Sequence, residues 1–251
     1  GELLAKDNER FGPRIFHAAW SSPALGTVNG KKLIFYGGPD GMMYAFEALP
    51  EDTPRDEVQD FKKVWQFDGD PTAPKDSLDT YLKNFKTGPS GILGMPVFYK
   101  DRIYFTIGGD PWWGKREAWL KCIDATKTGD ITETGEIWSL PLERHSTATP
   151  SISEGLVYVT DCGKNVFCVD AETGELIWTH QLKSKSWSST LVADNKIYVG
   201  SLGGDYWVLE AGRTKNIIDS AMFRRPIHST TAVSDGMLFI STLDRLYAIE
   251  K

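Results

Sequence analysis

A module of roughly 40 residues recurs along this chain and limits the folds that it can adopt. The fullest copy, residues 145–181, contains four short apolar segments separated by polar turns. A small residue opens the first segment of each of five copies: Pro23, Pro96, Pro150, Thr190 and Thr231. Repeats of four strands with this period are typical of radial β folds, in which each unit is stable only when packed against its neighbours.

The second and third segments of each module have the composition of buried strands. In four copies an aromatic residue follows the opening residue at the same spacing: Tyr104, Tyr158, Tyr198 and Phe239. Apolar alternation predicts second strands at 102–107, 156–160, 196–200 and 237–241. Third strands are predicted at 43–47, 119–124, 166–170, 206–210 and 246–250, and fourth strands carry Trp65, Trp138 and Trp178. Sheet packing alone accounts for these aromatic residues.

The pattern therefore predicts an all-β fold, a β-propeller of four-stranded antiparallel blades with about five blades present. A single domain would span 1–251, with blades at roughly 15–68, 89–141, 145–181, 185–221 and 226–251. Residues 2–6 read like a fourth strand and would complete the last blade, which closes a five-bladed ring. The alternative is that the chain is the carboxy-terminal part of a larger propeller.

One segment carries a resemblance to a known family. The sequence CVDAETGELIW, residues 168–178, resembles the tryptophan-docking motif of quinoprotein alcohol dehydrogenase-like propellers, with Asp170, Thr173, Gly174 and Trp178 at its characteristic positions. In that family the tryptophan packs against the turn of a neighbouring blade, so the resemblance implies a structural role for these four residues.

A wider resemblance is to the PQQ-like repeat proteins of planctomycete-type bacteria. It rests on WSSPALG at 20–26, GGPDGMMYAFEA at 37–48 and CIDATKTGDIT at 122–132. Members of that branch are usually periplasmic or secreted, mostly lack an assigned activity and usually have more blades. The resemblance implies the same location for this protein, although the chain contains no signal-peptide pattern.

Charge and composition exclude several classes of function. The formal net charge is -6 and the basic residues are scattered, so we expect no nucleic-acid partner. The nearest approach to a basic cluster is Arg224, Arg225 and His228 with Lys183 and Lys185. No apolar run is long enough to span a membrane. The three cysteines are expected to be free, and no spacing typical of a metal site occurs.

Quinoprotein enzymes hold pyrroloquinoline quinone (PQQ) between a tryptophan and a disulfide of adjacent cysteines, beside a calcium ion. This chain has no adjacent cysteine pair, and no calcium ligands or catalytic base match the family pattern. We therefore predict no catalytic residue, no metal site and no cofactor. PQQ with calcium is expected only if the chain is a dehydrogenase domain or fragment.

The best candidates for a site are the side chains just before the first strands. If these strands line the axis, Trp20, His145, Trp187 and His228 lie at the channel mouth, where indoles could stack on a planar or sugar-like ligand. A purely structural plug is the alternative. The segment Asp110–Trp113 is expected to form an exposed aromatic loop, and 76–85 to form a short amphipathic helix over a blade edge.

Two functions follow from these observations. The first is a non-enzymatic extracytoplasmic binding or scaffold propeller that engages a protein partner or a small ligand, such as a carbohydrate, through its loops and channel mouth. The second is a PQQ-dependent quinoprotein dehydrogenase domain or fragment. We expect the first, because fold alone implies no chemistry.

Overall fold

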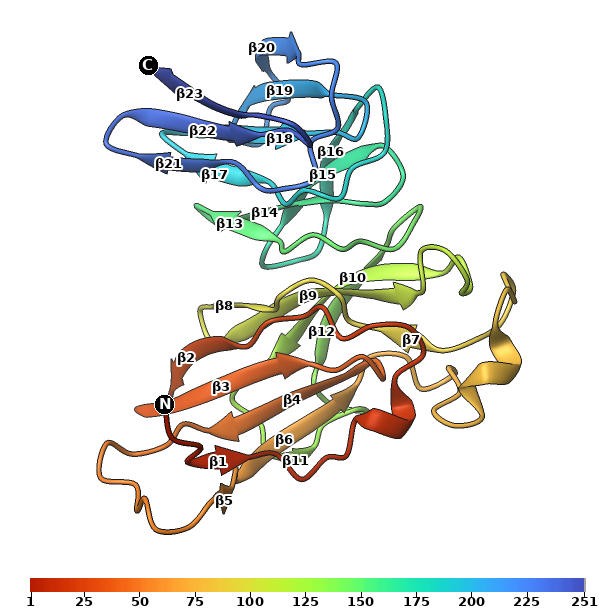
Figure 1. Cartoon of the computed structure of the whole chain (residues 1–251), viewed down its shortest axis with the longest axis vertical. Coiled ribbons are helices and arrows are strands. Elements are labelled where there is room, and N and C mark those ends of the chain that lie inside the picture. Colours follow the sequence, from red (N-terminus) through yellow and green to blue (C-terminus); the bar gives the residue numbers. More distant parts are fainter. Residues whose placement is uncertain (251) are drawn as a thin grey trace.

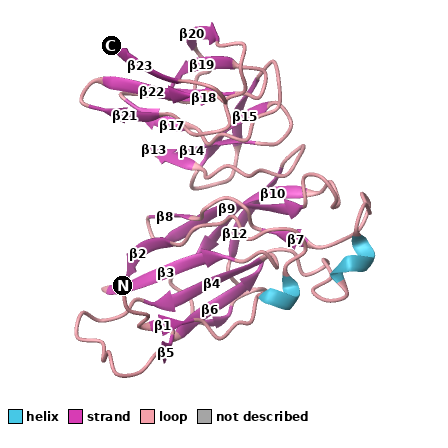
Figure 2. Ribbon diagram, viewed as in Figure 1, coloured by secondary structure: helices cyan, strands magenta, loops and turns pink. Residues whose placement is uncertain are grey.

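Five mainly antiparallel β-sheets follow one another along the chain in the computed structural model, which describes residues 1–250. Figures 1 and 2 show that almost all of the regular structure is strand. The first sheet contains β2 (Ala24–Val28), β3 (Lys31–Gly37), β4 (Met42–Glu47), β6 (Lys63–Asp68) and β11 (Gly129–Asp130). The second contains β7 (Ser90–Gly91), β8 (Val97–Tyr99), β9 (Arg102–Gly109), β10 (Ala118–Asp124) and β12 (Glu136–Pro141).

The last three sheets are simpler. The third contains β13 (Ser151–Ser153), β14 (Leu156–Thr160), β15 (Asn165–Asp170) and β16 (Leu176–Gln181). The fourth contains β17 (Leu191–Ala193), β18 (Lys196–Gly200), β19 (Asp205–Glu210) and β20 (Ile217–Met222). The fifth contains β21 (Ala232–Ser234), β22 (Met237–Ser241) and β23 (Leu246–Glu250). The all-β propeller architecture and the positions of the predicted strands are confirmed.

The same tight turn joins the first strand of each module to the second. Two residues form it in every module, and both have positive φ: Asn29 and Gly30, Lys100 and Asp101, Glu154 and Gly155, Asp194 and Asn195, Asp235 and Gly236. This geometry is that of a type I′ hairpin turn, whose twist matches that of the flanking strands. It fixes the register of each meander and hence the face that the aromatic residues bury.

Consecutive sheets pack face to face and share their cores. Trp65 of the first sheet lies in one cluster with Phe105 of the second, and Leu120 of the second lies with Val157 of the third. The third and fourth sheets share a cluster through Val166 and Ile197. The fourth and fifth share a smaller one that contains Tyr206 and Ile240. Stacking of meanders in this way is the packing that the repeat predicts.

The amino-terminal segment does not complete the last sheet, so the expected pairing of residues 2–6 is wrong. Instead β1 (Ala5–Lys6) pairs in parallel with β5 (Gln59–Asp60), and Gln59 donates to the Leu4 carbonyl at 2.9 Å. The first and last sheets lie at opposite ends of the longest axis (Figure 1). The segment between β4 and β6 supplies β5, so the amino-terminal strand pairs within the first module and the described residues form an open arc (Figure 1).

The amphipathic helix predicted at 76–85 does not form, so this prediction is also wrong. Only one 3-10 turn, η2 (Leu78–Tyr81), follows Ser77, which has a left-handed backbone. Leu78 is buried, whereas Leu82 and Phe85 are half exposed, so the segment anchors one side chain and does not cover an edge. The other helical turn is η1 (Gly12–Arg14). Among residues 1–250 no helix is long and apolar enough to cross a bilayer.

Candidate functional site

A continuous strip of aromatic rings crosses the molecule between sheets that are distant in sequence. Trp20, which precedes β2, contacts Trp112 of the β9–β10 loop at a centroid distance of 5.5 Å. Trp112 contacts Trp187, which precedes β17, at 5.3 Å. Trp187 in turn contacts His228, which precedes β21, at 5.2 Å. We call this series, together with His17 and Trp113, the aromatic strip.

The rings of the strip meet edge to face and remain accessible. The Trp20–Trp112 and Trp112–Trp187 planes cross at 87° and 76°, a favourable arrangement for the ring quadrupoles. Trp20 is 48% exposed, Trp112 36% and Trp113 37%. These three indoles therefore form an exposed apolar surface.

Asp110 fixes the loop that carries the two central indoles. One oxygen, Oδ1, accepts from the backbone N–H groups of Trp112 and Trp113, both at 2.9 Å. The other, Oδ2, lies 2.7 Å from Nδ1 of His17. The His17 ring packs against Trp113 with a centroid distance of 4.5 Å. A single carboxylate therefore orders the β9–β10 loop and joins it to the segment before β2.

The structure brings three of the four candidate site residues into this strip. Trp20, Trp187 and His228 contact one another in series, although only through Trp112, which the sequence indicated as an exposed loop residue without this bridging position. His145 lies elsewhere: its side chain is buried beside Asp110 and lines a separate pocket. It precedes Pro150 by five residues, whereas the other three precede their opening residue by three, and this offset explains the different position.

The four motif residues lie where one sheet meets the next. Asp170 accepts from the backbone N–H groups of Glu172 and Thr173 at 2.9 and 3.0 Å, which shapes the turn after β15. Gly174, at φ +76°, lies under the ring of Trp138 from the preceding sheet. The Trp138 indole donates to the Ala171 carbonyl at 3.0 Å.

The same contact recurs at the next interface. Trp178 donates through its indole N–H to the Gly212 carbonyl at 2.8 Å, in the turn of the fourth sheet. Trp65 donates to the Ala125 carbonyl of the second sheet at 3.1 Å. Each tryptophan thus joins its own sheet to the next turn along the chain, a structural role.

A buried ion pair supports the β9–β10 loop from below. Lys115 and Asp70 are 4% and 5% exposed in their side chains, and they contact each other through Nζ and Oδ2. Ser90 also donates to Oδ2 of Asp70, at 2.6 Å. Burial disfavours the charged carboxylate, but the hydrogen bonds from Lys115, Ser90 and Thr72 outweigh it and lower the pKa of Asp70 to about 2.

The cysteines do not form the arrangement that PQQ requires. Cys122 lies on β10, Cys168 on β15 and Cys162 in the β14–β15 turn, and all three are free thiols. Burial raises the pKa of Cys122 and of Cys168 to about 12, so both are small apolar groups at neutral pH. Within residues 1–250, no cluster of three or more His, Cys, Asp or Glu side chains could hold a metal ion.

Two features of the surface were missed from the sequence. One is the contact between His17 and Asp110, which joins residues 93 positions apart. The other is a basic pocket beside the strip, lined by Arg116, Arg144, Lys164 and Lys185. Alignment of the repeat sequences contains a partial signal for this pocket, because His145 and Lys185 both precede the opening residue of their module by five positions. Of the basic cluster expected from the sequence, Lys185 lines this pocket, whereas Lys183, Arg224, Arg225 and His228 do not.

Comparison with known proteins places this arrangement among propellers. Residues 116–217 match the family model described as outer membrane protein assembly factor BamB. Among solved structures, BamB from Moraxella catarrhalis superimposes with a TM-score of 0.63 and 18% identity, over 92% of this chain and 58% of that one. The search among curated proteins found no significant match.

Two further solved structures share the fold. A europium-containing methanol dehydrogenase aligns with a TM-score of 0.62 and 13% identity, over 87% of this chain and 51% of that one. The C-terminal WD40 domain of Sif2 aligns with a TM-score of 0.59 and 13% identity, over 86% of this chain and 54% of that one. The chain thus spans between half and three-fifths of the length of these structures. These likenesses show that the chain has a β-propeller fold.

Proposed function

We propose that this protein is a non-enzymatic binding propeller, a scaffold or assembly factor that engages a protein partner through the aromatic strip. The observation that carries the proposal is the unbroken series of ring contacts from Trp20 through Trp112 and Trp187 to His228. Tryptophan is enriched among the residues that contribute most to protein interfaces. An exposed, contiguous apolar surface is typical of such interfaces.

The comparisons support the same class of function. The family model that matches residues 116–217 is described as an outer membrane protein assembly factor. By this likeness we propose a periplasmic or outer-membrane-associated location. Of the strip, only Trp187 lies inside the matched segment, so the likeness does not extend to the other strip residues.

Site-specific photocrosslinking tests the proposal. A benzoylphenylalanine at exposed Ala19, beside Trp20, should give a discrete crosslinked product in cells. Its yield should fall at least fivefold when Trp20→Ala and Trp112→Ala are combined. The matched control carries the photocrosslinker at Leu25, which is 73% exposed on β2 and outside the strip. Equal products from both positions, or a product that survives the double substitution, would contradict the proposal.

A dehydrogenase and a carbohydrate-binding module are the competing functions. Incubation of the purified chain with PQQ and calcium should leave its melting temperature unchanged and give no dye-linked alcohol oxidation. A saturable rise in melting temperature would favour the dehydrogenase. Saturable quenching of tryptophan fluorescence by a glycan, without strip-dependent crosslinking, would instead assign the strip to a carbohydrate.

A further inference from the structure

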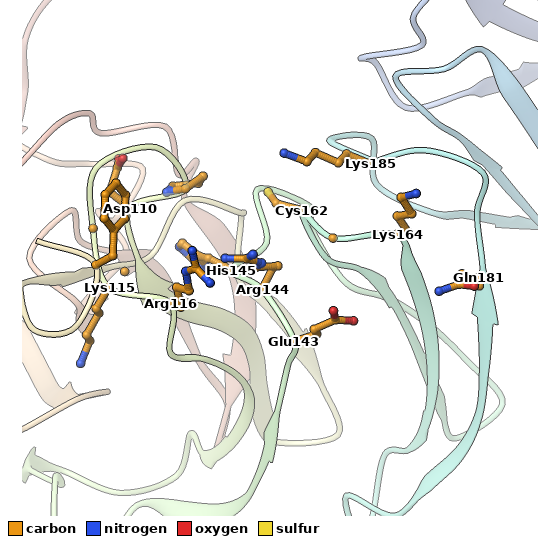
Figure 3. Close-up of a pocket in the computed structure, with 15 residues that line it drawn as sticks. Asp110, Lys115, Arg116, Glu143, Arg144, His145, Cys162, Lys164, Gln181 and Lys185 are labelled. Atoms are coloured by element: carbon orange, nitrogen blue, oxygen red, sulfur yellow. The ribbon is translucent and has the colours of Figure 1, made fainter. Parts of the chain in front are cut away.

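A pocket of about 520 Å³ opens beside the aromatic strip, between the second and third sheets. Five segments form its wall: the β9–β10 loop, the connection from β12 to β13, the β14–β15 turn, the connection from β16 to β17, and the segment between η2 and β7, which contributes Phe85. This volume is typical of sites for small molecules. Figure 3 shows the side chains that converge on it from these segments.

The lining of this pocket is strongly basic in a chain whose net charge is -6. Arg116, Arg144, Lys164 and Lys185 contribute four cations, and within residues 1–250 none of them forms an ion pair or a side-chain hydrogen bond. A fifth cation, Lys115, already pairs with Asp70 and Glu117 and points away from the centre in Figure 3.

The two carboxylates of the lining already have partners. Oδ2 of Asp110 lies 2.7 Å from Nδ1 of His17, and Oε2 of Glu143 accepts from the Asn165 amide at 2.7 Å. Neither carboxylate contacts any of the four cations at ion-pair distance. Cations outnumber carboxylates two to one among these six side chains, so the pocket presents an excess of positive charge.

A buried histidine provides a second, independent observation. His145 is only 4% exposed and lines the pocket, and neither of its ring nitrogens forms a hydrogen bond of standard geometry in the described structure, although the Gly91 backbone lies near enough to raise its pKa. In Figure 3 its ring lies beside the Arg116 and Arg144 side chains at the centre of the view. A buried polar group without a partner is costly and rare, and a bound ligand group is one way to satisfy it.

We propose that this pocket binds a small polyanion that carries carboxylate or phosphate groups. The guanidinium groups of Arg116 and Arg144 match either group with paired N–H donors, and His145 supplies a further N–H donor at the buried end. Lys164 and Lys185 neutralise charge at the rim. This binding is independent of the partner proposed for the aromatic strip, so either proposal can fail alone.

Calorimetric titration of the whole chain with pyrophosphate and with citrate tests the proposal at low ionic strength. We expect saturable binding of at least one of them, at least tenfold weaker in the Arg116→Gln, Arg144→Gln double variant. Both arginines are exposed, so this variant should keep its fold and its melting temperature. Which probe binds more tightly distinguishes a phosphate ligand from a carboxylate ligand.

The matched control removes the same charge elsewhere. Lys31 and Lys62 are exposed and both contact Glu47, far from the pocket lining, so a Lys31→Gln, Lys62→Gln variant should bind like the wild type. His145→Phe should weaken binding severalfold through loss of its N–H donor. No saturable binding, equal weakening in both double variants, or binding of an acidic peptide but neither probe would overturn the proposal.

Discussion

Gly174 shows how closely the tryptophan of one sheet meets the turn of the next. Its φ is +76°, and a Cβ added there would lie 2.6 Å from Cδ2 of Trp138. Gly155 is a matched control, because its φ is +77° and a Cβ there would meet no atom within 4 Å. Substitution of each glycine by alanine therefore separates the free-energy cost of a left-handed backbone from the cost of the steric contact with Trp138.

We predict that Gly155→Ala lowers the free energy of unfolding by about 1 kcal/mol, the cost of a left-handed backbone for alanine. Gly174→Ala should lower it by about 2 to 4 kcal/mol, because displacement of the Trp138 ring adds to that cost. Urea denaturation of both variants measures the difference. Equal losses would mean that the ring moves aside freely.

His145 links the stability of the fold to pH. Burial lowers its pKa to about 4, against the opposing influence of Asp110 and the Gly91 backbone. An unfolded chain binds a proton at this side chain below a pH of about 6.5, whereas the folded chain does not until about pH 4. The contribution of neutral, buried His145 to the free energy of unfolding is therefore fully present above about pH 6.5 and is lost as the pH falls toward 4.

We predict that the free energy of unfolding falls by roughly 3 kcal/mol more between pH 7 and pH 4 in the wild type than in His145→Gln. Urea denaturation across this range measures the two slopes. Identical slopes for the wild type and His145→Gln would show that His145 does not carry the effect.

At the scale of elements, local sequence was sufficient for the strands and insufficient for the segments between them. The alternating segments around Tyr158 and Tyr198 specify both strand and register, because a one-residue slip would expose the aromatic ring. The segment at 76–85 has helical spacing too, but Ser77 takes a left-handed backbone and only one turn forms. The spacing of apolar residues alone does not predict this conformation, which depends on contacts with residues distant in sequence.

The β9–β10 loop is the element on which the strip depends, and Asp110 is its main support. We predict that Asp110→Ala lowers the free energy of unfolding by about 1 to 3 kcal/mol, since it removes acceptors from two backbone N–H groups. Acrylamide quenching of tryptophan fluorescence should rise as Trp112 and Trp113 become more mobile. Asp110→Asn keeps one acceptor oxygen and should stay close to the wild type in quenching.

At the scale of the whole molecule, the repeat specified which sheets pack together but not where the chain ends lie. We predict that a Leu3→Cys, Leu246→Cys variant forms no intramolecular crosslink with a short bis-maleimide, because the first and last sheets lie at opposite ends of the arc. Both positions are exposed, at 64% and 70%, and thus accessible to the reagent. Mass spectrometry after proteolysis identifies the crosslink.

The positive control for this experiment comes from the observed pairing of the amino-terminal strand. Ala5 lies opposite Gln59 in the β1–β5 pair, so an Ala5→Cys, Gln59→Cys variant should crosslink readily. A crosslink between positions 3 and 246 in the monomer would contradict the open arc and support the closed five-bladed ring predicted from the sequence. Sequence could not decide this point, because residues 2–6 fit either edge by composition alone.

The candidate site was predictable in part for a similar reason. The modules specify that Trp20, Trp187 and His228 take equivalent positions, so their approach to one axis follows from the repeat. Trp112 belongs to an insertion, and its place between two of them depends on the turn that Asp110 forms. The four unpaired cations of the basic pocket come from four separate connections, and only the packed sheets bring these together.

The strand β11 has a practical consequence for dissecting the molecule. By sequence it belongs to the second module, but by hydrogen bonding it extends the first sheet, where Gly129 lies opposite Trp65 and Ile131 is buried in the shared core. A truncation made between these modules would remove β11 from the edge of the first sheet. In a fragment that contains only the second module, β11 would have no strand to pair with, and Ile131 would be exposed to solvent. Fragments intended for expression should keep both modules intact and be cut only beyond Pro141, where β12 ends.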